Sequence, residues 1–180
     1  MSKIKLALLL PAVAVLSACS ILQPEDTGLT TGEEISVTTS EIPPYEAKDV
    51  TNVEVTSNLG EWQKDEGLGV SWQLQGAYSD SIRGTVVTIL LRNDNDVPLP
   101  TDAIGEPTLE RSDGSGGWTR VDLLPYDPEQ NSDVVSPGLD FPLGAGASTN
   151  LQYRFDITTG NVWNSRLSIG NITWVGNLNL

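Results

Sequence analysis

Two side chains that enzymes use heavily are almost absent from this sequence. It has no histidine, and Cys19 is the only cysteine among 180 residues. Without histidine, serine and cysteine nucleophiles lack their usual base, and zinc sites built from His or Cys ligands cannot form. A carboxylate pair acting on a glycosidic bond stays open, but no spacing marks two acidic residues for that task. We therefore predict no catalytic residues, no cofactor and a non-enzymatic role.

Basic residues are scarce as well. Beyond residue 18 the chain carries all 24 acidic residues and only 8 of the 10 basic ones, a formal net charge of −16. Such a surface repels nucleic acid and anionic lipid. We expect no nucleic-acid partner, and the same acidity favours solubility.

The sequence also lacks a hydrophobic run long enough to cross a membrane. The apolar stretch from Leu6 to Leu16 follows Lys3 and Lys5, whereas a transmembrane helix needs about 20 apolar residues. A basic start, a short apolar run and small residues at its end are typical of an export signal. The sequence thus predicts a signal peptide over residues 1–18 that is removed from the mature protein.

The end of this signal, Leu16-Ser17-Ala18-Cys19, resembles the lipobox of bacterial lipoproteins at each of its four positions. The resemblance implies cleavage between Ala18 and Cys19, transfer of diacylglycerol to the cysteine sulfur, and acylation of the new amino group by a fatty acid such as palmitate. The partner of this end is then the cell membrane, at its extracytoplasmic face. The alternative is a chance cysteine in an ordinary secretory signal.

Residues 19–49 read as a tether. They are rich in Thr, Ser, Glu, Pro and Gly, and seven acidic residues face a single Lys48, a composition that predicts a disordered and self-repelling segment. A flexible coil of about 30 residues spans on the order of 30 Å between its ends. The only short motif that could serve as a partner-binding tail is Ile42-Pro43-Pro44-Tyr45.

From Val50 to Leu180 the apolar residues recur with a period of two, which indicates strands. In residues 67–79 one face collects Leu68, Val70, Trp72, Leu74 and Tyr78, and in residues 149–158 one face collects Leu151, Tyr153, Phe155 and Ile157. Residues 84–93 are apolar on both faces, which predicts a central strand. Val53 and Val55 open the domain, and residues 167–178 close it with further strand pattern.

Turn signals separate these strands. Asp113-Gly114 through Gly117 predicts a hairpin within residues 107–124, and no window of twelve residues after Cys19 has helical periodicity. Six to eight short strands between such turns predict an all-β fold, an antiparallel immunoglobulin-like β-sandwich preceded by a disordered linker.

Three segments of the domain resemble those of small bacterial envelope lipoproteins and secreted antigens with an immunoglobulin-like domain. They are the strand and turn of residues 86–99, the hairpin with its Asp-Gly tip, and the Pro/Gly loop and strand of residues 142–157. The resemblance implies a fold rather than an activity. The disulfide of antibody domains is missing, because there is no second cysteine.

The loop RNDNDVPLPTD is the closest approach to a metal site. Its side chains Asn93, Asp94, Asn95, Asp96 and Asp102 offer oxygen ligands of the kind that calcium prefers. The spacing differs from that of an EF-hand, and Asn and Asp are also common turn formers. We interpret the loop as a turn and predict no metal ligand.

Five tryptophans raise the possibility of stacking on sugars. Trp72 and Trp174 lie in alternating strands and are expected in the core, whereas Trp62 and Trp163 lie in loop-like sequence and could be exposed. The sequence therefore predicts a membrane-anchored, extracytoplasmic lipoprotein that binds or assembles with an envelope protein or a cell-wall component. The alternatives are a carboxylate-based wall-modifying enzyme and a calcium- or glycan-binding module.

Overall fold

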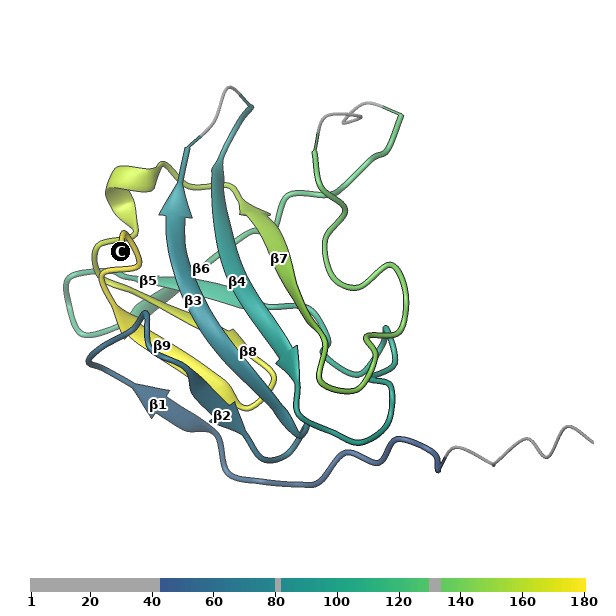
Figure 1. Cartoon of the computed structure of the whole chain (residues 1–180). Coiled ribbons are helices and arrows are strands. Elements are labelled where there is room, and N and C mark those ends of the chain that lie inside the picture. The colour runs from purple at the N-terminus through teal and green to yellow at the C-terminus, as the bar shows by residue number, and fades with distance from the viewer. Residues whose placement is uncertain (1–42, 80–81, 130–133) are drawn as a thin grey trace, which may run out of the picture. The chain divides into compact units, whose positions relative to one another are not determined.

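The alternating segments form nine strands in two β-sheets (Figure 1). The computed structural model describes residues 43–79, 82–129 and 134–180. A five-stranded sheet has the order β1-β9-β8-β5-β6, and a four-stranded sheet has the order β2-β3-β4-β7. The strands are β1 Val53–Val55, β2 Gln63–Asp65, β3 Val70–Tyr78, β4 Thr85–Asn93, β5 Thr108–Ser112, β6 Trp118–Val121, β7 Ser148–Phe155, β8 Ser165–Ile169 and β9 Ile172–Gly176. The only helical segment in the described ranges is the 3-10 turn η1, Thr159–Asn161.

The chain moves between the two sheets in the order of an immunoglobulin-like domain. Strands β3 and β4 pair in one sheet, β5 and β6 pair in the other, β7 returns to β4, and β8 and β9 complete the five-stranded sheet. The prediction of an all-β, immunoglobulin-like sandwich is confirmed. The prediction that all strands pair antiparallel is wrong at one edge, where β1 runs parallel to β9. These two strands are far apart in the sequence, so no hairpin imposes an antiparallel pairing on them.

The core lies between the inner faces of the two sheets. Trp72 of β3 and Trp174 of β9 are fully buried, one from each sheet, as the alternation predicted. Leu151, Tyr153 and Phe155 of β7 are buried as well. Burial of large aromatic side chains dominates the packing energy of a core, so the strand pattern of the sequence also locates what holds the sheets together.

The strand that is apolar on both faces is central, as predicted. β4 pairs with β3 on one side and with β7 on the other. Val87, Ile89 and Leu91 face the core, and Val86 on the other face is only 3% exposed. On that outer face Thr88 and Leu90 are half-buried and Arg92 is exposed, so the outer face is shielded mainly at the start of the strand.

One strand departs from the predicted alternation. The register of β3 against β4 shifts between Leu74 and Gly76, which inserts one extra residue into β3. Such a bulge exchanges the two faces of the strand beyond it. Tyr78, predicted on the inner face with Trp72, is 42% exposed as a result.

The folded unit begins earlier than the predicted boundary at Val50. The Tyr45 hydroxyl donates to the Leu68 carbonyl at 3.1 Å, and the Lys48 backbone N–H donates to the Gly67 carbonyl at 2.7 Å. Tyr45 also packs against the core. The tether-like composition of this stretch gave no sign that Tyr45 packs on the domain. The assignment of residues 45–49 to the tether is therefore wrong. The remainder of the predicted tether, up to residue 42, lies outside the described residues.

The Asp-Gly hairpin is confirmed between β5 and β6. The Asp113 carboxylate accepts hydrogen bonds from the backbone N–H groups of Ser115 and Gly117 at 2.7 and 2.9 Å and from the Ser115 hydroxyl at 2.8 Å. These bonds, led by that of the Ser115 backbone, lower the pKa of Asp113. The turn therefore holds itself closed without help from the rest of the domain.

Candidate functional site

The predicted lipid-attachment site lies outside the described residues. This holds for Cys19 and for the residues of the cleavage motif, Leu16, Ser17 and Ala18, so the lipid anchor stays a prediction. Within residues 43–79, 82–129 and 134–180, no helix has the length and apolarity to span a membrane.

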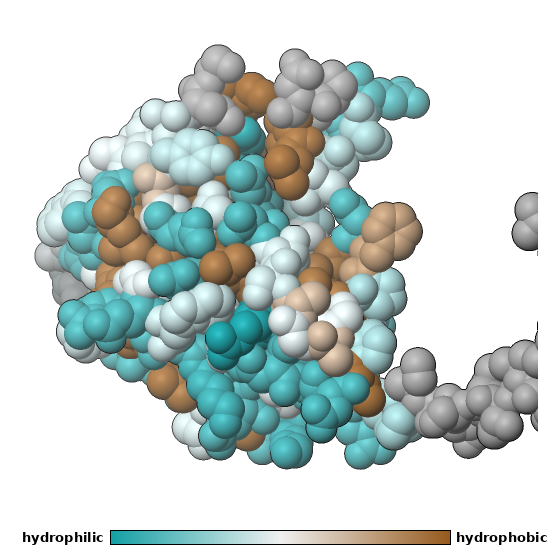
Figure 2. Space-filling model, viewed as in Figure 1, coloured by the Kyte–Doolittle hydropathy of each residue, from teal (hydrophilic) through white to brown (hydrophobic). Residues whose placement is uncertain are grey.

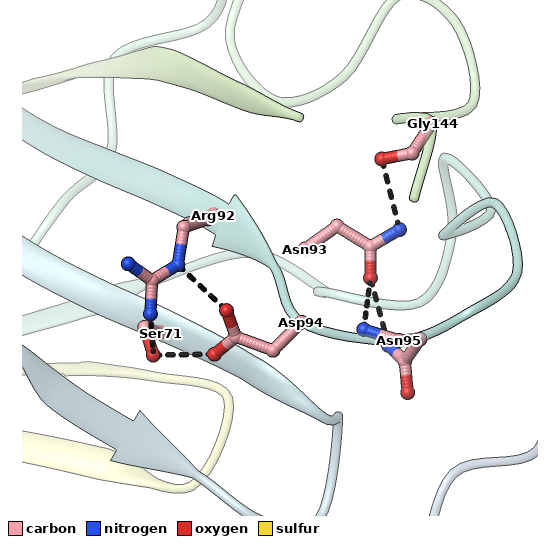
Figure 3. Close-up of polar contacts among 6 residues, drawn as sticks. All are labelled: Ser71, Arg92, Asn93, Asp94, Asn95 and Gly144. Carbon is pink, nitrogen blue, oxygen red and sulfur yellow. Dashed lines mark hydrogen bonds and ion pairs between the residues drawn. The ribbon is translucent and has the colours of Figure 1, made fainter. Parts of the chain in front are cut away.

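The Asn93–Asp102 loop is a turn closed by its own amides (Figure 3). The Asn93 side-chain nitrogen donates to the carbonyls of Val97 and Leu143 at 2.9 Å and of Gly144 at 3.2 Å. Its side-chain oxygen accepts the backbone N–H and the side-chain amide of Asn95 at 3.0 and 2.9 Å. Asn93 is completely buried, so this amide fixes the loop to the segment before β7.

Asp94 points away from those amides, toward the strands (Figure 3). Its carboxylate accepts from the Ser71 hydroxyl at 2.5 Å and from Arg92 Nε at 2.6 Å. Burial alone would raise the pKa of Asp94, but the hydrogen bonds from Arg92 and Ser71 outweigh it and the pKa is lowered. The oxygens of the loop thus do not converge on one point, and no cluster of three or more acidic, His or Cys side chains in the described ranges could hold a metal.

Both loop tryptophans are exposed, but they belong to different parts of the domain. Trp62 precedes β2, is 41% exposed and has the Arg92 guanidinium over its ring at 5.0 Å. Trp163 is 65% exposed in the connection from η1 to β8. Figure 2 shows the side of the molecule on which the four-stranded sheet lies, where apolar residues appear in small groups between hydrophilic ones. Trp62 and Trp163 thus lie on different connections of the domain.

A groove of about 560 Å³ lies at one end of the sandwich. Its lining comes from the connections at the ends of β4, β6 and β7, together with β5 and η1. The residues are Arg83, Gly84, Arg111, Arg120, Val121, Asp122, Asp156, Ile157, Thr158 and Asn161. We call this feature the arginine groove.

The floor of the arginine groove is held by tight local contacts at the start of β4. Gly84 has a φ of +93°, and a Cβ there would lie 2.5 Å from the Phe155 carbonyl oxygen, so the backbones approach as only glycine allows. The buried Thr85 hydroxyl donates to the Ile157 carbonyl at 2.6 Å. These contacts fix the segment after β7 against β4 and so position the acidic side of the groove.

The charges in the groove are unequally paired. Arg83 makes a two-point ion pair with Asp156, with Nε 3.1 Å from one carboxylate oxygen and Nη2 in contact with the other. Arg111 and Arg120 are exposed, and neither forms an ion pair with any other described residue. Asp122 is the remaining acid of the lining. The lining therefore has one more positive than negative charge, on a chain that is strongly acidic overall.

The neighbouring sheet surface explains why Arg120 has no close partner. Arg120 lies opposite Glu110 across the β5–β6 pairing, but the Glu110 carboxylate accepts a hydrogen bond from Arg166 Nε of β8. That hydrogen bond is the main reason that the pKa of Glu110 is lowered. Burial raises the pKa by less than the hydrogen bond lowers it, and the positive charges of Arg166 and Arg120 lower it further. Arg166 in turn lies over the Trp118 ring at 4.9 Å. The Glu110 carboxylate is thus paired with Arg166 of β8, and the Arg120 guanidinium, which lines the groove, has no ion pair with it.

Sequence reasoning did not find the arginine groove. Its three arginines stand 28 and 9 positions apart, in a hairpin connection and on two different strands, and form no motif. Only the scarcity of basic residues could have drawn attention to them, because three of the eight beyond residue 18 meet in one place.

The groove and the start of the folded unit lie at opposite ends of the sandwich (Figure 1). Tyr45 bonds to Leu68, just before β3 begins, whereas Arg83 follows the far end of β3. A strand of nine residues spans roughly 30 Å.

Comparison with known proteins adds no assignment. No protein-family model, no curated protein and no solved structure matches this chain.

Proposed function

We propose that this chain is a lipid-anchored, extracytoplasmic binding protein of the bacterial cell envelope, with no catalytic role. The observation that carries the proposal is the single cysteine at the end of Leu16-Ser17-Ala18-Cys19, after an apolar run too short to cross a membrane. Diacylglycerol on the Cys19 sulfur and a further acyl chain on its amino group would attach the protein. Each buried methylene contributes about 0.8 kcal/mol, so two or three chains give stable attachment where one alone is marginal.

The described domain supports a binding role through its rigid frame and its groove. The two sheets enclose a core in which Trp72 and Trp174 are fully buried, and the arginine groove is lined by β5, β6 and the connections that this frame holds in place. Binding sites are commonly built from loops on such scaffolds. The partner we propose is another component of the envelope, either a protein or a wall polymer, which the groove contacts.

The anchor is tested by replacing Cys19 in the full chain expressed in a lipoprotein-processing bacterium. Cys19→Ala should abolish incorporation of labelled palmitate and move the protein from the membrane fraction to the soluble fraction. Ser20→Ala, one position further on, is the matched control and should keep both the label and the membrane location. Retention of Cys19→Ala in the membrane fraction would rule out the lipid anchor.

A second candidate is a wall-modifying hydrolase, because two carboxylates line the arginine groove. Asp122 and Asp156 are neighbours there, with the Asp156 backbone N–H donating to the Asp122 carbonyl at 2.9 Å, and a pair of carboxylates is what glycoside hydrolysis uses. Asp156 is bound by Arg83, which leaves Asp122 as the free acid. Release of reducing sugar from purified cell wall by the wild type, lost in Asp122→Asn, would favour this candidate over the binding protein.

A further inference from the structure

We infer that the arginine groove binds the oxyanion groups of an anionic envelope polymer, and that this polymer lies away from the membrane to which the protein is anchored. The first part concerns the chemistry of the groove alone. The second part rests on the proposed lipid anchor, because it needs the N-terminal end of the chain to face the membrane.

The charge of the groove favours an anion. Three of the eight basic residues in the described ranges line it, and Arg83 is already neutralised by Asp156. Arg111 and Arg120 remain, each exposed and without an ion pair in this part of the chain. A guanidinium group presents several N–H donors in one plane and matches a carboxylate or a phosphate at two points.

The groove favours a polymer over a single small anion. It is open to solvent and offers two available cations with Asp122 beside them, so a lone oxyanion would gain only a weak and screened attraction. A chain that repeats the oxyanion raises the local concentration of the group at the site, and rebinding then increases the apparent affinity. The net negative charge of the remainder of the protein would disfavour binding of the polymer elsewhere.

The position of the groove selects the polymer over the lipid headgroups of the anchoring membrane. The chain joins the domain beside Leu68, and the groove lies beyond the other end of β3, roughly 30 Å away. With a net charge of −16 beyond residue 18, an anionic membrane surface repels the domain as a whole. The groove therefore lies at the end of the domain opposite to the one where the chain that carries the proposed anchor enters.

The test uses the purified full-length protein in neutral detergent and three probes: inorganic polyphosphate, poly-glutamate and vesicles of phosphatidylglycerol. Polyphosphate and poly-glutamate separate phosphate from carboxylate as the preferred group, and the vesicles represent the membrane. The test variant is Arg111→Gln with Arg120→Gln. The control is Lys64→Gln with Arg92→Gln, which removes the same charge outside the groove. Melting temperatures verify that all variants fold.

We expect at least one polymer to bind at low salt, with its affinity reduced tenfold or more in the groove variant and less than twofold in the control. The dependence of binding on salt should also weaken in the groove variant alone. Equal losses in both variants, or no binding of either polymer, would overturn the oxyanion site. Vesicles that bind through the groove as tightly as the polymers would overturn the assignment to a ligand away from the membrane. The polymer results do not depend on acylation, so they fail separately from the palmitate test of the anchor. Acyl chains insert into vesicles in every variant, so vesicle binding through the groove is measured only as the difference between the wild type and the groove variant.

Discussion

Asp65 of β2 binds Asn171 across the two sheets, 106 positions later in the sequence. The Asp65 carboxylate accepts the Asn171 backbone N–H and its side-chain amide, both at 2.9 Å. Asn171 lies in the turn between β8 and β9 of the five-stranded sheet, whereas β2 is the edge of the four-stranded sheet. The same carboxylate accepts the backbone N–H groups of Gly67 and Leu68 and the indole N–H of Trp72. Asp65 is 1% exposed, so five donors meet a buried acceptor that connects the sheets.

Removal of this carboxylate should cost much more stability than removal of an exposed one. Asp65→Ala leaves three buried and two half-buried donors without an acceptor, and we expect a loss of about 3–5 kcal/mol in the free energy of unfolding. Urea denaturation followed by tryptophan fluorescence measures it. The exposed Asp140 is the control, and Asp140→Ala should change stability by less than about 0.5 kcal/mol. Similar losses in the two variants would show that Asp65 does not connect the sheets.

The tryptophans provide a second comparison within one residue type. Trp72 is fully buried and Trp163 is 65% exposed. Trp72→Ala opens a cavity in the core and should cost about 3–5 kcal/mol, whereas Trp163→Ala should cost less than about 0.5 kcal/mol. The fluorescence of the folded wild type should also lose its most solvent-exposed component in Trp163→Ala. A large destabilisation by Trp163→Ala would contradict its position on the surface.

Because of the bulge in β3, we expect Leu74 and Tyr78 to differ in their effect on stability, whereas strict alternation of the strand would place both in the core. Leu74, before the bulge, is 1% exposed, and Tyr78, after it, is 42% exposed. Leu74→Ala should lower the free energy of unfolding by about 2–5 kcal/mol, and Tyr78→Ala by less than about 1 kcal/mol. Equal effects, measured by urea denaturation, would mean that the strand keeps its register and that Tyr78 faces the core.

Acid should destabilise the protein through Asp94 and Glu110. Hydrogen bonds from Arg92 and Ser71 lower the pKa of Asp94 despite its burial, and the hydrogen bond from Arg166 lowers that of Glu110. A carboxyl group with a lowered folded-state pKa stabilises the fold above its unfolded pKa, roughly pH 4, and this contribution is lost as the pH falls through the folded pKa.

Asp94→Asn combined with Glu110→Gln should therefore lower stability at pH 7 and flatten its fall below about pH 4. The measurement is a series of urea denaturation curves from pH 2 to pH 7. Asp140→Asn, which removes one exposed carboxylate outside these contacts, should run parallel to the wild type. If the stability of the double variant falls with pH as that of the wild type does, Asp94 and Glu110 do not cause the loss of stability in acid.

The fold was largely predictable because burial in a sandwich follows the two-residue period of its strands. Residues 149–158 and 84–93 form the strands that their patterns indicate, with β7 buried on one face and β4 central in its sheet. Two features could not be predicted from local pattern. The bulge at Gly76 depends on the pairing with β4, and the place of Tyr45 depends on the Leu68 carbonyl, 23 positions away.

The candidate site was less accessible to sequence reasoning, for a physical reason. Arg83, Arg111 and Arg120 acquire a common role only when β3–β4 and β5–β6 are packed in different sheets and share one end of the sandwich. The Asn93–Asp102 loop shows the reverse. Its oxygens are adjacent in the sequence, but the structure directs the Asp94 carboxylate to Ser71 and the Asn93 amide to the Val97 carbonyl, so adjacency in the sequence does not bring these two side chains to one point.

The proposed lipid anchor, which would determine where the domain acts and what its groove can meet, is tested most directly by mass spectrometry of the protein isolated from bacterial membranes. We expect a mature chain that begins at Cys19 and carries a diacylglycerol on the sulfur. A mature N-terminus at any other residue, or an unmodified thiol at position 19, would contradict it.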